Sequence, residues 1–212
     1  MAENKYLELA RIAKSENNSE DAKNYYNKVR EEDPQSGEAK FFYAYYALYE
    51  GTNGELYSRF SNLCKVLIPS IKLVKESDLE KDEQLKIISE IVNTFVPEVW
   101  AENRYMNHKN HEKKIGDSYV TVFDSKIITS TCKIGLAALK ELGDFVEKLY
   151  INDSTCQVLA VTTWKEYVSL LQKWYAYAPK GEAEAYAEKI KKYEASYEMP
   201  KKAGCISLGD KK

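Results

Sequence analysis

Apolar residues recur every three to four positions along most of the chain. In the first run these positions are Tyr6, Leu9, Ala10 and Ala13. A polar Asn17-Asn18 pair ends that run, and in the next one the apolar positions are Ala22, Tyr26 and Val29. This spacing puts the apolar side chains on one face of a helix. Ser19 suits the N-cap of the second helix, and Pro34 ends it because proline cannot continue the hydrogen-bond ladder. The first 34 residues therefore predict two short amphipathic helices.

Residues 35–69 repeat this arrangement less regularly. Ser36 is placed to cap a helix whose apolar positions are Tyr43, Ala44 and Ala47. Glycines and short polar residues at positions 51–54 predict a turn. The helix after it has its apolar positions at Leu56, Phe60 and Leu63. Pro69 then stands near the expected end, so the sequence predicts a second helical hairpin.

Two short helices within about 34 residues, closed by a proline, resemble a tetratricopeptide repeat. The residues that match the family pattern, with the family's spacing, are Tyr6, Leu9, Ala10, Ala13, Ala22, Tyr26, Val29 and Pro34. Ala13 stands where the family usually has an aromatic residue, and Val29 stands where it usually has alanine. Both positions remain apolar. The resemblance implies that the second hairpin, residues 35–69, stacks on the first and covers its apolar face.

Longer helices are expected after residue 69. Pro69 itself predicts a break or kink, and a capping-box pattern at residues 77–80 starts the next helix. The apolar stripe behind this cap consists of Leu85, Ile88, Ile91, Val92, Phe95 and Val99. It passes Pro97, where a kink is expected. Residues 152–155 start a later helix, whose apolar positions are Val158, Val161, Trp164, Val168, Leu171 and Tyr175. Residues 182–197 predict a last amphipathic helix, and with the helix before it they echo the repeat.

Residues 116–150 allow two interpretations. The β-branched and aromatic residues of 119–123 and 127–131 suit a hairpin that turns at residues 124–126. However, apolar residues recur at helical spacing from Tyr119 to Leu149, and Asp117 could cap a single long helix. We favour the helix, because periodicity is the stronger signal.

The sequence thus predicts an all-α protein. Residues 1–69 form tetratricopeptide-like hairpins, the second degenerate. Residues 70–200 form a longer helical bundle or degenerate superhelix that ends in a repeat-like hairpin. Residues 201–212, rich in lysine, form a disordered tail.

Composition narrows the class of function. The 212 residues carry a net charge of −2 and no concentrated basic segment, which argues against nucleic-acid binding. No stretch approaches the roughly 20 apolar residues of a membrane span, and the start lacks the pattern of a secretory signal. Four cysteines occur without a C-x-x-C pair, which favours reduced cysteines in the cytoplasm over a zinc site or a disulfide framework.

Candidate catalytic chemistry is sparse. His108 and His111 could share one helix face, but they lack further ligands and lie among lysines, so no metal site is predicted. Glycine-rich phosphate loops and nucleophile-elbow motifs do not occur. We therefore expect no catalytic residues, no cofactor and a non-enzymatic protein. An enzyme hidden in the central helices is the least favoured alternative.

The resemblance also implies where a partner would bind, since ligands of this family lie on the concave face of the first helices of the repeats. By spacing, that face would show Asn4, Leu7, Arg11, Lys14, Phe41, Tyr45 and Leu48. Aromatic residues beside basic donors suit an extended peptide or an acidic tail. Leu7 stands where a carboxylate clamp would need a lysine, so such a clamp is not predicted. The resulting hypothesis is a protein-interaction or scaffold module; the alternative is a homo-oligomer, because no polar capping helix precedes the first repeat.

Overall fold

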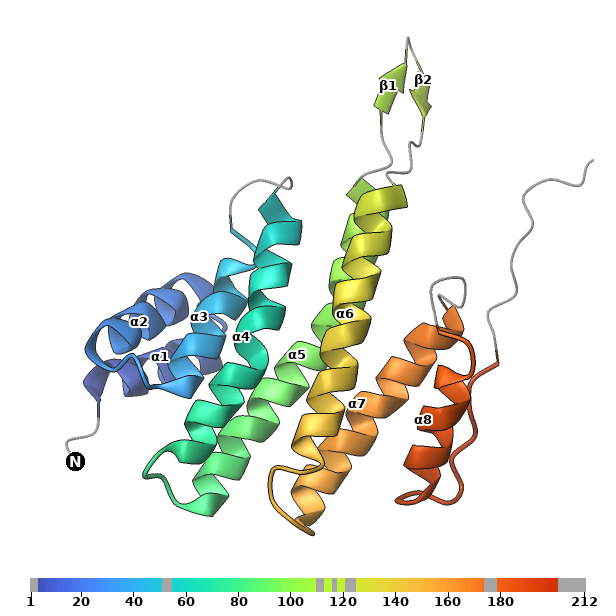
Figure 1. Ribbon diagram of the computed structural model, residues 1–212. Coiled ribbons are helices and arrows are strands. Elements are labelled where there is room, and N and C mark those ends of the chain that lie inside the picture. Colours follow the sequence, from blue (N-terminus) through green and yellow to red (C-terminus); the bar gives the residue numbers. More distant parts are fainter. Residues whose placement is uncertain are drawn as a thin grey trace, which may run out of the picture. The chain divides into compact units, whose positions relative to one another are not determined.

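The computed structural model describes residues 4–50, 55–109, 113–115, 118–120, 125–173 and 179–201 (Figure 1). Within these ranges the chain forms eight helices: α1 (Lys5–Ser15), α2 (Ser19–Glu32), α3 (Gly37–Ala47), α4 (Leu56–Glu76), α5 (Lys81–Lys109), α6 (Ser125–Val146), α7 (Ser154–Lys173) and α8 (Glu182–Lys191). Two three-residue strands, β1 (Lys113–Ile115) and β2 (Ser118–Val120), pair between α5 and α6. The predicted all-α class is confirmed.

The chain divides into two units, Met1–Ala138 and Leu139–Lys212, here named unit 1 and unit 2. The division falls inside α6. The boundary proposed from the sequence, between residues 69 and 70, falls inside α4.

Short polar side chains start the first three helices. Asn4 caps α1, because its side-chain oxygen accepts hydrogen bonds from the backbone N–H groups of Tyr6 (3.0 Å) and Leu7 (3.3 Å). Asn18 caps α2, so the prediction of Ser19 as the cap is wrong by one residue. The predicted cap of α3, Ser36, is confirmed.

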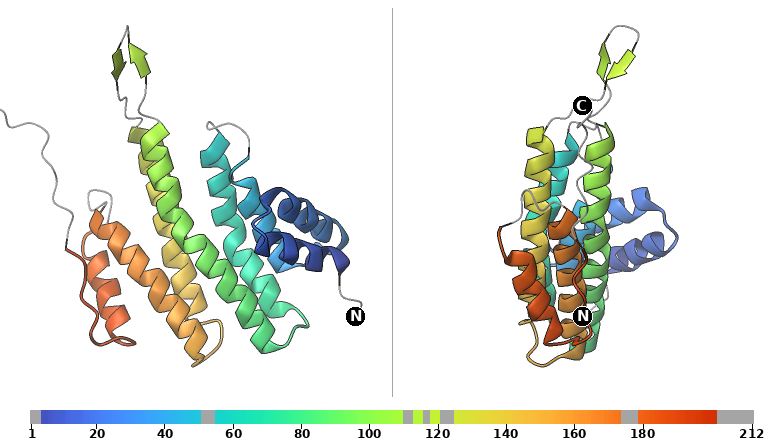
Figure 2. Two further views of the ribbon diagram at one scale, coloured as in Figure 1. Left: turned by 180° about the vertical axis from the view of Figure 1, so that it is seen from behind. Right: turned by 90° about the vertical axis from the view of Figure 1, so that its right-hand side faces the viewer.

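Unit 1 is built by helices that pack on their neighbours in the chain. α1 packs on α2, α2 on α3, α3 on α4 and α4 on α5, and α3 also contacts α5 (Figures 1 and 2). The predicted apolar faces supply the core, which includes Ala10, Ala13, Ala22, Tyr26, Val29, Phe60, Leu63, Ile88, Ile91 and Phe95. Gly37 at the start of α3 allows a close approach to α4, since a Cβ atom there would lie 2.2 Å from the carbonyl oxygen of Ser70.

Both prolines of the central helices lie within continuous helix. α4 does not break at Pro69 but runs from Leu56 to Glu76, which corrects the predicted end of the second hairpin. Its neighbours Ile68, Ser70 and Ile71 are buried while Pro69 is exposed, so packing on either side holds the helix together. α5 likewise continues past Pro97, as predicted.

The segment before α6 differs from both sequence interpretations. β1 and β2 are antiparallel, with Lys113 opposite Val120 and Ile115 opposite Ser118. The single helix favoured from residue 117 is therefore wrong for residues 118–120, where β-branched and aromatic composition prevails. The alternative hairpin across residues 124–126 is also wrong, because residues 125–131 lie in α6.

Unit 2 contains the C-terminal part of α6, α7 and α8. Within it, α7 packs on α8. Trp164 of α7 is fully buried, and Gly143 of α6 leaves room for its indole, since a Cβ atom there would lie 2.4 Å from the ring nitrogen. Val158, expected on the buried face of α7, is instead 64% exposed. The last helix ends at Lys191, six residues before its predicted end. The predicted turn at 51–54, His111, Tyr175 and the tail from 202 onward lie outside the described residues.

Candidate functional site

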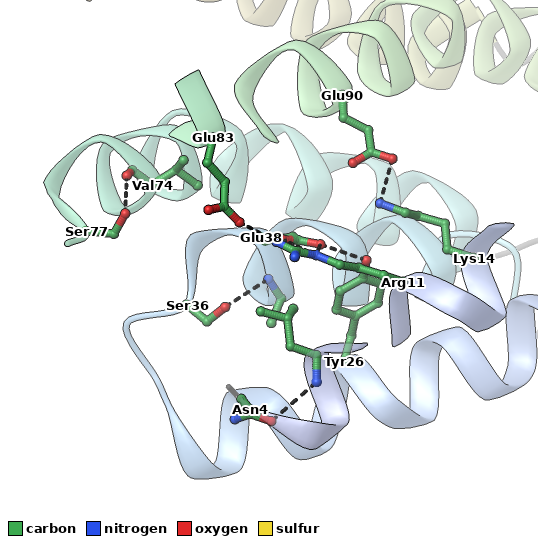
Figure 3. Close-up of polar contacts among 12 residues, drawn as sticks. Asn4, Arg11, Lys14, Tyr26, Ser36, Glu38, Val74, Ser77, Glu83 and Glu90 are labelled. Atoms are coloured by element: carbon green, nitrogen blue, oxygen red, sulfur yellow. Dashed lines mark hydrogen bonds and ion pairs between the residues drawn. The ribbon is translucent and has the colours of Figure 1, made fainter. Parts of the chain in front are cut away.

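A buried polar cluster joins the first three helices (Figure 3). Glu38 of α3 is only 3% exposed, and its carboxylate faces Arg11 of α1 and Tyr26 of α2. Arg11 donates from Nε (3.0 Å) and Nη2 (2.7 Å), and the Tyr26 hydroxyl donates at 3.1 Å. Both carboxylate oxygens are therefore bound, which is the condition for burying a charge without a large penalty.

The electrostatics of this cluster favour the charged pair. Hydrogen bonds to Glu38 raise the pKa of Arg11, which stays protonated. Burial, and then the neighbouring Glu38 charge, raise the pKa of Tyr26, which stays neutral and acts as a donor. The cluster is thus a fixed structural element that sets the position of Arg11.

A pocket of about 320 Å³ lies between α1 and α5 and shares Arg11 with this cluster. Its lining consists of Arg11, Lys14, Ser15, Glu83, Lys86, Ile87 and Glu90. The α5 residues among them are three to four positions apart and so share one helix face. Ile87 is 4% exposed and provides the apolar part of the wall.

Ion pairs cross this pocket from α1 to α5. Lys14 Nζ lies 2.6 Å from Glu90, and Arg11 Nη2 lies 3.7 Å from Glu83 (Figure 3). The two glutamate side chains remain 45% and 42% exposed, so water and a ligand can reach them. Lys86 makes no ion pair within the part of the chain that the structure describes. The pocket therefore offers both signs of charge, bound in pairs that a ligand could exchange.

Of the seven residues predicted to face a ligand, the structure brings two, Arg11 and Lys14, to this pocket. Phe41 and Leu48 are 0% exposed and belong to the core, so the expected aromatic groove does not reach them. The Tyr45 hydroxyl lies 3.5 Å from the Glu98 carboxylate of α5. Asn4 is a helix cap, and Leu7 is partly exposed outside the lining.

Sequence reasoning missed the α5 half of the pocket. Neither Glu83 nor Glu90 is among the seven residues predicted from the sequence to face a ligand. The signal available was their separation of seven residues, with Ile87 between them, which places them on one face of α5. Nothing in the local pattern shows that this face lies opposite α1.

A second polar cluster holds unit 2 together. Asp144 of α6 accepts hydrogen bonds from the Trp164 ring nitrogen (3.2 Å), the Tyr186 hydroxyl (2.6 Å) and Lys189 Nζ (2.8 Å). The Lys189 ammonium also lies 2.8 Å from Glu147 and 3.9 Å from the centre of the Trp164 ring. Every donor is committed to a partner on a neighbouring helix, so this cluster serves to fix α7 and α8 on α6.

Asp144→Asn is expected to destabilise unit 2 by about 1–3 kcal/mol at neutral pH, because it removes the charge that receives these bonds. Burial alone would raise the pKa of Asp144, but the bonds from Lys189 and Tyr186 outweigh it and the pKa is lowered. A lowered pKa means that this contribution is present above the unfolded-state pKa of about 4 and is lost as pH falls through the lower folded value.

Hydrogen exchange of α7 and α8 at pH 7 and at pH 3 measures this difference. We expect faster exchange of the variant at pH 7 and a smaller difference at pH 3. Glu188→Gln is the matched control, since the Glu188 side chain is 70% exposed and forms an ion pair with Lys191 of the same helix. If Asp144→Asn lost the same protection from hydrogen exchange at both pH values, the charge of Asp144 would not be what stabilises unit 2.

By its fold and its pocket, the protein belongs to the structural class of all-α proteins and has a polar pocket between two of its helices. No family model, no curated protein and no solved structure matches the chain. The resemblance to tetratricopeptide repeats therefore stays a prediction. In the described part of the chain, no group of three or more His, Cys, Asp or Glu side chains could hold a metal ion. None of the described helices is both long and apolar enough to cross a membrane.

Proposed function

We propose that the protein is a non-enzymatic protein-interaction module that binds a peptide segment of a partner in the α1–α5 pocket. The observation that carries this proposal is the pocket itself, with its exchangeable ion pairs and its buried Ile87 wall. Its volume of about 320 Å³ lies at the small end of ligand sites, which range from roughly 300 to 1,000 Å³. Such a space suits one or two side chains of a peptide.

The groups lining the pocket suit recognition better than catalysis. The Ser15 hydroxyl donates to the Ile12 carbonyl oxygen at 2.7 Å, so it is not paired with a base that would make it a nucleophile. Glu83 and Glu90 are seven residues, or two helical turns, apart, which is about 10 Å along the axis of α5. Each is paired with a basic side chain of α1. These are the groups of a surface that exchanges ion pairs with a partner.

A steric block tests the position of the site. Peptides selected from a random displayed library on the native chain are measured against Ser15→Trp, which places an indole in the pocket. We expect at least a tenfold loss of affinity, about 1.4 kcal/mol. Ser58→Trp, at an exposed position of α4 outside the pocket, is the matched control and should change affinity less than twofold. Equal affinity of both variants, or no selected peptide, would overturn the proposal.

Self-association, the alternative from the sequence, also stays a prediction. Light scattering over a range of concentrations measures it directly.

A further inference from the structure

The Lys14 side chain lines the pocket, and its ammonium group occupies a site of distinct chemistry. Its ammonium group lies 3.9 Å from the centre of the Phe42 ring and 6.0 Å from that of Tyr26. On the other side it lies 2.6 Å from Glu90 Oε1 (Figure 3). Four helices thus contribute to one place: α1 provides the cation, α2 and α3 the rings, and α5 the carboxylate.

The rings form a continuous aromatic wall. Tyr26 stacks on Phe42 with 5.3 Å between ring centres and on Tyr46 at 6.3 Å. Tyr26 and Phe42 are fully buried, so their positions do not depend on Lys14 alone. Burial, and to a lesser extent Tyr45 and Glu90, raise the pKa of Tyr46 to about 12, so this ring stays neutral. Aromatic faces attract a cation electrostatically, as in the aromatic cages that bind quaternary ammonium groups, and a neighbouring carboxylate adds to this attraction.

Lys14 is suited to leave this site. It belongs to the pocket lining, its side chain retains 17% exposure, and its charge would be solvated in the open pocket. Glu90 is 42% exposed, so an ammonium group that enters through the pocket can reach the same carboxylate. The exchange replaces one primary ammonium group by another at the same rings and the same oxygen, so no buried charge is left unpaired.

We propose that Phe42, Tyr26 and Glu90 form a recognition site for the side-chain ammonium of a lysine in a partner peptide, which Lys14 fills in the free protein. This inference rests on the proposed function, because the peptide reaches the site through the α1–α5 pocket. The internal cation competes with the ligand, so the apparent affinity equals the intrinsic affinity multiplied by the fraction of time for which Lys14 is withdrawn. The competition makes binding selective for peptides that also gain contacts elsewhere in the pocket.

Vacating the site tests its chemistry. Lys14→Ala removes the atoms of propylammonium, and n-propylammonium chloride is then added as the probe. We expect a saturable rise in Tm of about 2–4 °C for Lys14→Ala. Lys14→Met fills the same space without a charge, so it should respond no more than to sodium chloride of equal ionic strength. The neutral isostere n-propanol should not stabilise Lys14→Ala, and Glu90→Gln in the Lys14→Ala background should abolish the rise.

Equal responses of Lys14→Ala and Lys14→Met to propylammonium would overturn the ammonium site. If Ser15→Trp still blocked the selected peptides in that case, the proposed function would stand and only this inference would fail. Support from the native chain requires that selected peptides carry a lysine. Its replacement by glutamine should then weaken binding at least tenfold, and Lys14→Ala should bind the lysine peptide more tightly than the native chain does.

Discussion

Replacing Glu38 by alanine is expected to destabilise unit 1 by about 3 kcal/mol, because it breaks a buried ion pair from one side. The carboxylate binds Arg11 at 2.7 Å and 3.0 Å and accepts a hydrogen bond from the hydroxyl of Tyr26, a residue that is itself 0% exposed. Its removal leaves a buried hydroxyl without its acceptor. Arg11 retains 35% side-chain exposure and can turn to water, which keeps the loss near the lower end for broken buried pairs.

The matched control uses the second carboxylate next to the same guanidinium. Glu83 lies 3.7 Å from Arg11 and is 45% exposed, so Glu83→Ala should cost at most about 1 kcal/mol. Denaturant unfolding, with hydrogen exchange of α1–α3 as a local measure, compares the two variants. Similar losses for both would show that the Glu38 cluster does not stabilise unit 1 as its burial indicates.

Gly37→Ala should have an effect of similar size for a steric reason. The added Cβ atom would lie 2.2 Å from the Ser70 carbonyl oxygen and 2.8 Å from Val74 Cγ2. The closest atom belongs to the backbone of α4, so relief requires that α3 and α4 move apart. We expect a loss of about 3 kcal/mol, although alanine by itself favours a helix by about 1 kcal/mol over glycine.

Gly181→Ala is the comparison that measures the cost of a left-handed backbone without a steric clash. Gly181 has a φ of +80°, and its added Cβ would meet no atom of the described residues within 4 Å. Its cost is the left-handed backbone alone, about 1 kcal/mol. Thermal unfolding and hydrogen exchange of α3 and α8 measure the two effects. A Gly37 variant as stable as the Gly181 variant would contradict the close approach of α3 to α4.

Local features of the fold could be predicted from the sequence because their causes are local. Ala10, Ala13, Ala22 and Val29 are buried as their spacing predicts, and Ser36 caps α3. The end of α4 could not be predicted in this way. Pro69 weakens a helix locally, but the buried residues on both sides of it pack against neighbouring helices and stabilise α4. This tertiary packing cannot be read from the residues around a proline.

The candidate site could be predicted only in part for the same reason. Arg11 and Lys14 follow from helical spacing on α1, but Glu83 and Glu90 lie about 70 residues further along the chain and reach them only through tertiary packing. Phe41 is buried in the core and does not face a ligand as predicted. α3 is apolar around most of its circumference, so spacing does not show which side is buried.

The packing of each of the first helices on its neighbour in the chain has a consequence for synthesis. The contacts of α1 with α2 and of α2 with α3 join residues close in sequence, so little loop entropy is lost when they form. Folds rich in such contacts fold rapidly, and N-terminal segments fold first during translation. We therefore expect α1–α3 to assemble as the chain leaves the ribosome, before the residues of α5 that complete the pocket have emerged from it.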